Sequence, residues 1–270
     1  MRAEQASPSD GEPKLKSRTE VASGYPKREL PTERIDGWSN EYSDYKPAQY
    51  TSDKVIEQSG RTADPEDIAS VIGDGFQGSQ YKAVHNSQGY PLNPFGPTGI
   101  EGRGLLYKWG VNFTADPIVT RNNPESGQLE MVAIKRAGES GTGQWAIPGG
   151  FVEAGDSVSA TLAKEFKEEG LQGNDEKEID SVGERVLELL QEAPIVYRGF
   201  VDDPRTTDNA WIETTAAHLH LSEDLASKLK LEAGDDADSI QWMALTTENV
   251  GALYASHKEL VKLALEQLSS

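Results

Sequence analysis

The sequence predicts an α/β fold built as a helix–sheet–helix sandwich and preceded by a loop-rich N-terminal lobe. Strand-like and helix-like segments are mixed along the second part of the chain, and such a mixture buries its apolar faces best in layers. The first part is rich in Tyr, Pro and Gly and weak in periodicity, which favours loops, turns and short strands. With 270 residues, of which 36% are hydrophobic, the chain is long enough for one large or two modest domains.

We expect the chain to have three parts. Residues 1–21 are polar, with almost no large apolar groups, and are predicted to be a disordered tail. Residues 22–115 are predicted to form the N-terminal lobe. A folded domain, whose core begins near Asp116, takes up residues 116–270.

Within the folded domain, apolar alternation predicts strands and apolar residues at helical spacing predict helices. The predicted strands are residues 118–120, 129–135, 195–201, 210–221 and 239–243. The predicted helices are a glutamate-rich helix after a glycine turn at 149–150, a charged helix over 176–192 and a C-terminal helix over 247–268.

The chain is strongly acidic, with a net charge of −19 from 45 acidic and 26 basic residues. This balance disfavours nonspecific binding to nucleic acid or to anionic membranes, because both reward clustered Lys and Arg. An anionic substrate must therefore meet a locally basic pocket or a metal ion. The absence of cysteine excludes disulfides and thiolate zinc sites, and it is compatible with a reducing compartment.

Neither a membrane span nor a targeting segment is expected from the sequence. No apolar run approaches the roughly 18 residues that a span needs. The N-terminus lacks the apolar core of a signal peptide and is too acidic for an organelle transit peptide. We therefore expect a cytoplasmic location.

The glutamate-rich helix carries the most specific chemical signal. Its segment GGFVEAGDSVSATLAKEFKEEGL places Glu165, Glu168 and Glu169 at i, i+3 and i+4, on adjacent parts of a helix surface. Like charges at this spacing repel unless a cation neutralises them, and Mg²⁺ takes oxygen ligands and often brings a phosphate with it. The segment is therefore a candidate metal–diphosphate site. The alternative is a solvated acidic face on a surface helix.

The limits and faces of this helix follow from its own residues. Asp156 or Ser157 can cap its start, and Gly170 is an end signal. An apolar stripe repeats every four residues along it, at Val158, Leu162 and Phe166. Glu169 falls within the stripe and Glu165 at its edge, so both should face a cleft more than open water.

The segment resembles the Nudix box, whose pattern is G-x5-E-x7-R-E-U-x-E-E-x-G-U, with U an aliphatic or apolar residue. Aligned from Gly150, the box places Glu165, Glu168 and Glu169 on the three glutamates of REUxEE, which are the metal-binding and catalytic positions of the family. All three glutamates are intact, and the resemblance therefore implies an active box.

The chain departs from the box at four positions. Asp156 replaces the first glutamate, and Lys164 replaces the arginine. Leu171 and Gln172 stand where the final glycine and apolar residue are expected. Because lysine lacks the forked hydrogen bonding of arginine, we expect the glutamates to be held more loosely.

The resemblance extends from about Gly24 to the C-terminus. The chain is similar to the ADP-ribose pyrophosphatase branch of Nudix hydrolases, and equally to the Nudix domain at the C-terminus of ADP-ribose-gated melastatin-type TRP channels. The segments that carry the likeness are DYKPAQYTS (44–52), GRGLLYKWGVNFTADPIVTR (102–121), QWAIPGGFV (144–152), VYRGFVDDPRTTDNAWIET (196–214), LEAGDDA (231–237) and LYASH (253–257). The resemblance implies that residues 116–270 form a Nudix catalytic domain with a mixed sheet.

Two functions of different class follow from the resemblance. The first is metal-dependent hydrolysis of ADP-ribose at its diphosphate to AMP and ribose 5-phosphate, with Mg²⁺ as the ion or Mn²⁺ as the alternative. The second is an ADP-ribose-sensing, cytosolic domain of a cation channel with reduced or incidental hydrolysis, whose partner is the rest of that channel. In vertebrate channel domains the box is degraded, whereas KEFKEE keeps its acids here, which favours the enzyme. Hydrolysis of another nucleoside diphosphate compound is a third, weaker option, and no nucleic-acid partner or direct membrane insertion is expected.

The resemblance also implies the residues that hold the metal. The backbone of residues 149–150 is expected to approach the metal or the phosphates, since glycine lets a chain come close. The implied metal ligands are Gly150, Glu165, Glu168 and Glu169. The general base is open among Glu169, another box glutamate and an acid of residues 232–236.

Five further residues are implied as substrate contacts, namely Asn112, Asp203, Arg205, Tyr254 and His257. Arg205 offers a forked donor for phosphate or ribose oxygens. Tyr254 and His257 stand at i and i+3 of a helix start and should share a face. Each of these residues also has a purely structural alternative. For Asp203 and Arg205 it is a plain turn between strands at 202–207, and for Tyr254 and His257 it is a core tyrosine with a surface histidine. For Asn112 it is a turn or capping asparagine.

Overall fold

The computed structural model describes most of the chain, and the described residues pack into two compact units. Described are residues 15–38, 42–71, 73, 75–136, 143–153, 156–171, 181–231, 237–254 and 256–268. The N-terminal unit is Met1–Asn112 with Val201–Ile212, and the C-terminal unit is Phe113–Phe200 with Glu213–Ser270. Because residues 201–212 return to the first unit, the two units are not consecutive parts of the chain. The three-part division stays a prediction.

The N-terminal unit is built mainly of loops and turns, as its Gly- and Pro-rich sequence predicts. Its short elements are α1 (Lys16–Thr19), β1 (Ala48–Thr51), α2 (Asp53–Glu57), η1 (Ile68–Ser70) and β2 (Ile100–Gly104). β1 and β2 pair in parallel, with Ala48 opposite Ile100. A buried carboxylate holds loops together, because Asp208 accepts hydrogen bonds from the amide (2.7 Å) and hydroxyl (2.8 Å) of Thr98 and from the Tyr45 hydroxyl (2.5 Å).

The predicted disorder of the tail is wrong for residues 15–21, which include helix α1. The Arg18 side chain donates to the carbonyl oxygen of Pro97 (3.0 Å). The carboxylate of Asp202 accepts hydrogen bonds from two amide groups at the start of α1 (2.7 and 3.0 Å). This order comes from hydrogen bonds to distant parts of the sequence rather than from apolar burial, so composition could not reveal it. Residues 1–14 lie outside the described residues.

The sheet of the C-terminal unit is mixed, as predicted. Among the described residues it has seven strands in the order β5-β4-β3-β8-β7, with β6 paired to β3 and β9 to β4. The strands are β3 (Gly110–Asn122), β4 (Leu129–Arg136), β5 (Trp145–Ala146), β6 (Gly150–Phe151), β7 (Ile195–Val201), β8 (Ala210–His220) and β9 (Ala237–Ala244). β4 pairs antiparallel with β3, β5 and β9. β3 and β8 run parallel, because residue numbers increase in the same direction along both strands. Thr114 is bonded to Thr214, and further along Thr120 is bonded to Leu221.

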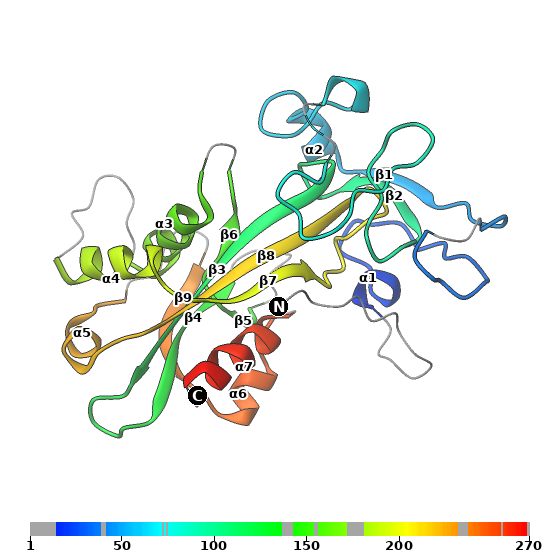
Figure 1. The fold of residues 1–270 in the computed structure, drawn as a ribbon. Coiled ribbons are helices and arrows are strands. Elements are labelled where there is room, and N and C mark those ends of the chain that lie inside the picture. The colour runs from blue at the N-terminus through cyan, green and yellow to red at the C-terminus, as the bar shows by residue number, and fades with distance from the viewer. Residues whose placement is uncertain are drawn as a thin grey trace. The chain divides into compact units, whose positions relative to one another are not determined.

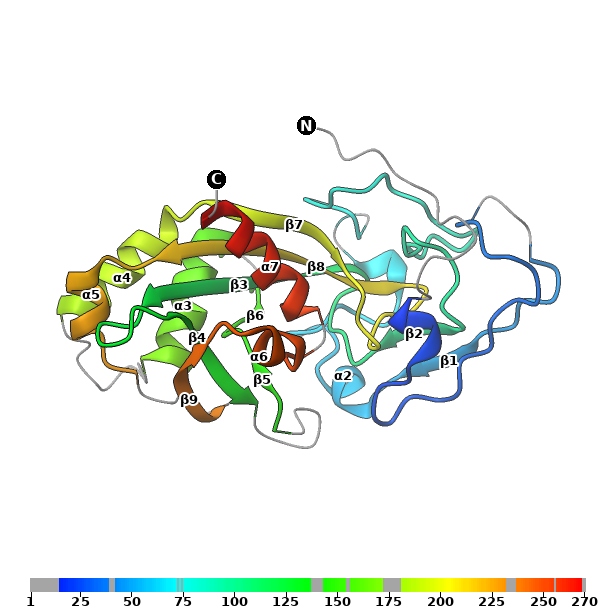
Figure 2. The same cartoon turned by 90° about the horizontal axis from the view of Figure 1, so that it is seen from below.

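Helices cover both faces of this sheet, which confirms the predicted sandwich. On one side lie α3 (Val158–Gly170), α4 (Ser181–Gln191) and α5 (Glu223–Lys228), and on the other α6 (Thr247–Gly251) and α7 (His257–Leu268) (Figure 1 and Figure 2). Successive strand residues point to opposite faces. Ile118 and Met131 therefore pack with α6 and α7, whereas Val119 and Val132 pack with α3, α4 and α5.

The prediction of one C-terminal helix over residues 247–268 is wrong, because α6 and α7 are separate. α6 ends at Gly251 and α7 begins at His257. Between them, the amide of Tyr254 donates to the carbonyl oxygen of Trp145 (2.8 Å). The chain leaves the helix to make this long-range contact, which the helical spacing of apolar residues does not indicate.

The other elements follow the predictions with different limits. The strands predicted over 129–135, 195–201, 210–221 and 239–243 are confirmed as β4, β7, β8 and β9. β3 is longer than the predicted 118–120, because polar residues and Pro117 hide its apolar alternation. α4 lies within the predicted 176–192, of which residues 176–180 are outside the described part. Among the described helices, none combines the length and low charge needed to cross a bilayer.

Candidate functional site

Helix α3 positions the acidic residues of the site against the sheet. The hydroxyl of Ser157, and not Asp156, caps its start by accepting from the amide of Ala160 (3.1 Å). The apolar stripe packs inward as predicted, since Leu162 lies in a cluster with strand residues and Phe166 is fully buried. The apolar side of α3 is therefore packed against the sheet.

The glutamates of α3 differ in their exposure to solvent. Glu165 is 9% exposed, in agreement with its predicted place at the edge of the stripe, whereas Glu168 is exposed. Glu169 belongs to α3, and its side chain lies outside the described part of the structure. One carboxylate of the box thus faces the protein and one faces water.

The two glycines of the turn before α3 each lie against a carboxylate. A Cβ on Gly150 would stand 2.6 Å from Oε1 of Glu165, and a Cβ on Gly149 would meet Oδ1 of Asp116 and, at 2.8 Å, the carbonyl oxygen of Ala115. Pairing of β6 with β3 sets this approach, because Gly150 stands opposite Ala115. Only glycine leaves room for both carboxylates beside the backbone.

Asp116 lies beside Gly149 and is a residue of this site that the sequence did not predict. It is buried, and it accepts a hydrogen bond from the hydroxyl of Thr214, which also donates to the carbonyl oxygen of Thr114 (3.3 Å). The sequence signal that could have indicated this role is an acidic residue directly before the apolar run of a predicted strand. A buried carboxylate at such a position needs partners, and Thr214 supplies one.

Lys164, which stands at the arginine position of the box, forms an ion pair with Glu153 (2.9 Å). The hydrogen bond that Lys164 donates to Glu153 and the nearby charge of Glu168 raise the pKa of Lys164, so it stays protonated. A single ammonium group directed at Glu153 cannot clamp two carboxylates as a guanidinium fork does. That the glutamates are held more loosely stays a prediction.

The donors on α3 and on the glycine turn fit a divalent metal ion. The carboxylate of Glu165 lies beside the backbone of Gly150, in a cradle that a Cβ would fill. Carboxylate and carbonyl oxygens are the ligands that hard cations such as Mg²⁺ take. Among the side chains that the structure describes, no three His, Cys, Asp or Glu residues stand in a metal-binding group. The implied set includes Glu169, whose side chain is outside that description.

Asp203 and Arg205 form a bidentate ion pair within the N-terminal unit. Nε of Arg205 meets Oδ1 of Asp203 and Nη2 meets Oδ2, both at 2.8 Å. The amide of Arg205 also donates to Oδ1 (2.8 Å). The Asp203 side chain is 3% exposed and that of Arg205 is 27% exposed. Residues 202–207 therefore form a turn, which was the structural alternative for this segment. The turn also holds the guanidinium of Arg205 in a fixed orientation.

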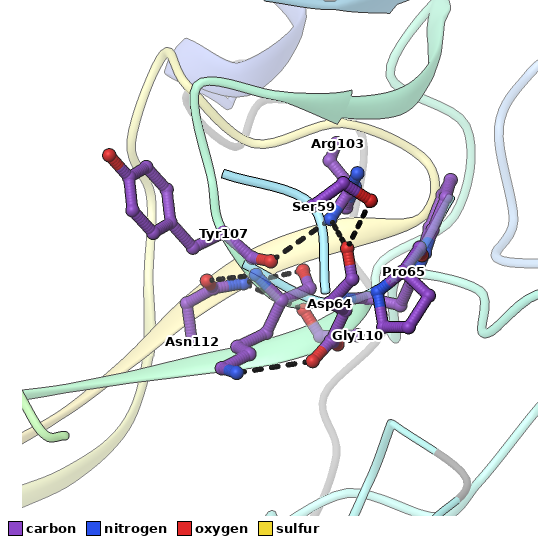
Figure 3. Close-up of polar contacts among 9 residues, drawn as sticks. Ser59, Asp64, Pro65, Arg103, Tyr107, Gly110 and Asn112 are labelled. Atoms are coloured by element: carbon purple, nitrogen blue, oxygen red, sulfur yellow. Dashed lines mark hydrogen bonds and ion pairs between the residues drawn. The ribbon is translucent and has the colours of Figure 1, made fainter. Parts of the chain in front are cut away.

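Asn112 lies at the start of β3, and its side chain is bonded to the preceding turn (Figure 3). Nδ2 donates to the carbonyl oxygens of Lys108 (3.0 Å) and Gly110 (3.2 Å), and Oδ1 accepts from the amide of Lys108 (2.9 Å). Asp64 holds the same turn through the amide of Trp109 (2.9 Å). These contacts favour the alternative of a turn asparagine, and a ligand contact of Asn112 remains a prediction.

Tyr254 and His257 lie side by side in the C-terminal unit. Their ring centroids are 5.9 Å apart and the rings meet edge to face. Tyr254 precedes α7 rather than belonging to it, so the predicted helical spacing is not the cause of this contact. Nδ1 of His257 accepts from the amide of Ile147 (2.9 Å), which places the proton of a neutral ring on Nε2. His257 is thereby tied to the segment that leads into Gly149.

The candidates for the general base lie partly outside the described residues. The acids among residues 232–236 lie outside the described part of the chain, as does the side chain of Glu169. Within the described part, Glu165 is buried beside the glycine turn and Glu168 is open to solvent.

Two family models match the chain and together account for most of it. The model of the NUDIX domain matches residues 114–264, and that of the NUDT9-like, N-terminal domain matches residues 30–110.

Three curated relatives are similar over most of this chain. "Putative nudix hydrolase 6" of Caenorhabditis elegans is 42% identical over 244 residues, which are 86% of this chain and 88% of the relative. "ADP-ribose pyrophosphatase, mitochondrial" of Rattus norvegicus is 39% identical over 262 residues, 88% of this chain and 73% of the relative. "Transient receptor potential cation channel subfamily M member-like 2" of Nematostella vectensis is 36% identical over 249 residues, 83% of this chain and 16% of the channel.

Proposed function

This chain belongs to the Nudix hydrolase family, and we propose that it hydrolyses the diphosphate of ADP-ribose to AMP and ribose 5-phosphate with the help of a divalent metal ion. The rat relative, named for this activity, is 39% identical over 88% of the chain and supports the choice of substrate. The observation that carries the proposal is the box itself, in which the buried carboxylate of Glu165 lies beside the backbone of Gly150.

The metal ligands of the proposal are Glu165, Glu168, Glu169 and the backbone of Gly150. Nudix hydrolases use divalent ions, and we propose Mg²⁺, with Mn²⁺ as the alternative, because all of these donors are hard oxygens. When bound, such an ion neutralises the diphosphate and lowers the pKa of a bound water.

The residues of the chain then position the groups that react. The carboxylate of Glu165 is buried and lies against the backbone of Gly150, which would place its oxygens beside the metal ion. Positioning and charge stabilisation supply most of the acceleration in phosphoryl chemistry. The base that takes the proton of the attacking water is to be sought among Glu169, another glutamate of α3 and the acids of residues 232–236.

The direct substrate contacts of the proposal are Asp203, Arg205, Tyr254 and His257, and Asn112 supports the site without touching the substrate. Arg205 is paired with Asp203, and its planar guanidinium suits phosphate or ribose oxygens. The aromatic ring of Tyr254 offers an apolar face to a base or sugar, and Nε2–H of His257 offers a donor. Asn112 contributes most simply through the turn that its side chain holds.

The proposal is tested by incubating the purified protein with ADP-ribose and Mg²⁺ and following AMP and ribose 5-phosphate by chromatography. Parallel reactions contain a chelator, or ADP-glucose or a diadenosine compound in place of ADP-ribose. We expect AMP from ADP-ribose, loss of the reaction with chelator and much slower turnover of the other compounds. Equal rates on all three substrates would contradict narrow ADP-ribose specificity.

A second function is favoured by the similarity to the sea-anemone channel, whose matching segment is 16% of its length. In this alternative the chain is an ADP-ribose-sensing domain in which hydrolysis is reduced or incidental. The intact glutamates of α3 favour the enzyme. Binding of ADP-ribose without AMP release would favour the sensor.

The compartment is a separate part of the proposal. We propose a cytoplasmic location, whereas one relative is named as mitochondrial and another is a channel. Fractionation of cells that express a tagged full-length protein distinguishes these locations.

A further inference from the structure

We propose that Tyr25 and Arg28 are positioning residues that hold the Asp203–Arg205 pair in the orientation in which it meets the substrate. This inference rests on the proposed function, since it assigns a role toward ADP-ribose. All the contacts that carry it lie within the N-terminal unit.

Three consecutive carbonyl oxygens of the loop around Arg205 are held by side chains from residues 25 and 28. Arg28 Nη2 donates to the carbonyl oxygens of Pro204 (2.5 Å) and Thr206 (3.2 Å). The hydroxyl of Tyr25 donates to the carbonyl oxygen of Arg205 itself (2.8 Å). The backbone is thus fixed on both sides of the residue whose side chain is the proposed ligand contact.

Arg28 is buried, and its guanidinium is committed to backbone carbonyls. Besides the loop, its Nε donates to the carbonyl oxygen of Glu20 (2.8 Å) and its Nη1 to that of Thr98 (3.0 Å). Burying a charged group is costly unless its donors are satisfied. A planar fork that joins three chain segments is a rigid brace, and a lysine has one ammonium group where the guanidinium has three nitrogens.

The hydroxyl of Tyr25 is locked between a donor and an acceptor. It accepts from the amide of Leu105 (2.7 Å) while it donates to the carbonyl oxygen of Arg205. Gly104, at a φ of +58°, lies so close that a Cβ there would stand 2.8 Å from Cε1 of the tyrosine ring. Burial raises the pKa of the Tyr25 hydroxyl, so the proton that the loop needs stays on it.

The opposite end of the loop is anchored as well, through Asp202 and the amides at the start of α1. The backbone is held at residues 204–206 and the side chain of Asp202 is anchored to α1, while the bidentate bond to Asp203 orients the Arg205 side chain. A guanidinium recognises a phosphate or a ribose only where its plane is already oriented. Loss of the brace should therefore weaken substrate binding more than the chemical step.

The test is steady-state kinetics of Tyr25→Phe with ADP-ribose and Mg²⁺. The variant keeps the ring and removes one hydroxyl, so we expect KM to rise about five- to tenfold, the equivalent of one hydrogen bond, with kcat within about twofold of wild type. The matched control is Tyr42→Phe, because the Tyr42 hydroxyl likewise donates to a carbonyl oxygen (Gly37, 2.9 Å) and accepts from an amide (Asp36, 2.9 Å). We expect KM to be unchanged in the control.

A double-mutant cycle separates positioning from general stability. In an Arg205→Ala background, Tyr25→Phe should have no further effect on KM, because the group that it positions is gone. If Tyr25→Phe fails to fold, Arg28→Lys takes its place in the same cycle, since it keeps the charge and loses the fork.

The outcomes distinguish this inference from the proposed function. A wild type that neither binds nor hydrolyses ADP-ribose overturns the proposed function and, with it, the inference. An active wild type with KM unchanged by Tyr25→Phe, or raised equally with and without Arg205, overturns the inference alone.

Discussion

The carboxylate of Glu165 occupies the space that a side chain at Gly150 would fill. Both of its oxygens stand within contact of a Cβ built there. The glycine turn and the acidic helix are therefore one unit of structure, in which the absence of a side chain on β6 permits a buried carboxylate on α3.

Gly150→Ala is expected to displace this carboxylate and to reduce kcat/KM for ADP-ribose about 100-fold, since a misplacement near 1 Å can cost that much. The overpacked site should also lose about 1–3 kcal/mol of unfolding free energy. Kinetics and thermal unfolding measure the two effects. The control is Gly251→Ala, because nothing lies within 4 Å of a Cβ at that position. Unchanged activity in Gly150→Ala would contradict the account of the turn.

Asn112→Ala distinguishes a turn asparagine from a ligand contact. The change removes the bonds to Lys108 and Gly110, and we expect the unfolding free energy to fall by about 1–3 kcal/mol while KM of the folded enzyme stays unchanged. Asn209→Ala is the comparison, because Asn209 braces Gly102 and Pro91 in the same unit and is not a proposed contact. A rise in KM for Asn112→Ala alone would assign the asparagine to the ligand.

Asp208 should make the protein less stable as the pH rises from about 4 to about 6. Burial raises the pKa of its carboxyl from the ordinary 3.8 to about 6, although hydrogen bonds from Tyr45 and Thr98 lower it. Between these values the folded state keeps a proton that the unfolded state has released, so raising the pH favours unfolding. The stabilisation is complete below about pH 4 and is lost as the pH rises through about 6.

The matched variant is Asp208→Asn, which has no titration there. Relative to it, wild type should lose on the order of 2–3 kcal/mol between pH 4 and pH 7. Urea unfolding of both proteins across this range measures the difference. Parallel curves would show that Asp208 titrates normally in the folded state.

The elements that the sequence predicts well are those whose signal is local. The stripe of Val158, Leu162 and Phe166 lies on one face of α3, and it packs inward as its period requires. Ile118 and Val119 are adjacent, and strand geometry alone sends them to opposite faces of the sheet. Local periodicity thus suffices for the layers of the sandwich.

The features that the sequence does not predict depend on contacts between distant residues. The break between α6 and α7 follows from the bond of the Tyr254 amide to Trp145, and the order of α1 from Asp202. Asp116 belongs to the site because β8 brings Thr214 beside it. None of these partners lies near its counterpart along the chain.

Hydrolysis of ADP-ribose at the carboxylates of α3 is measured as AMP release from ADP-ribose and Mg²⁺ by wild type and by Glu168→Gln. The Glu168 side chain is exposed, so the near-isosteric change should leave folding intact, which circular dichroism checks. We expect wild type to form AMP, and the variant to lose turnover while it keeps much of its binding of ADP-ribose by calorimetry. A variant as active as wild type, or a wild type that forms no AMP, would contradict the account.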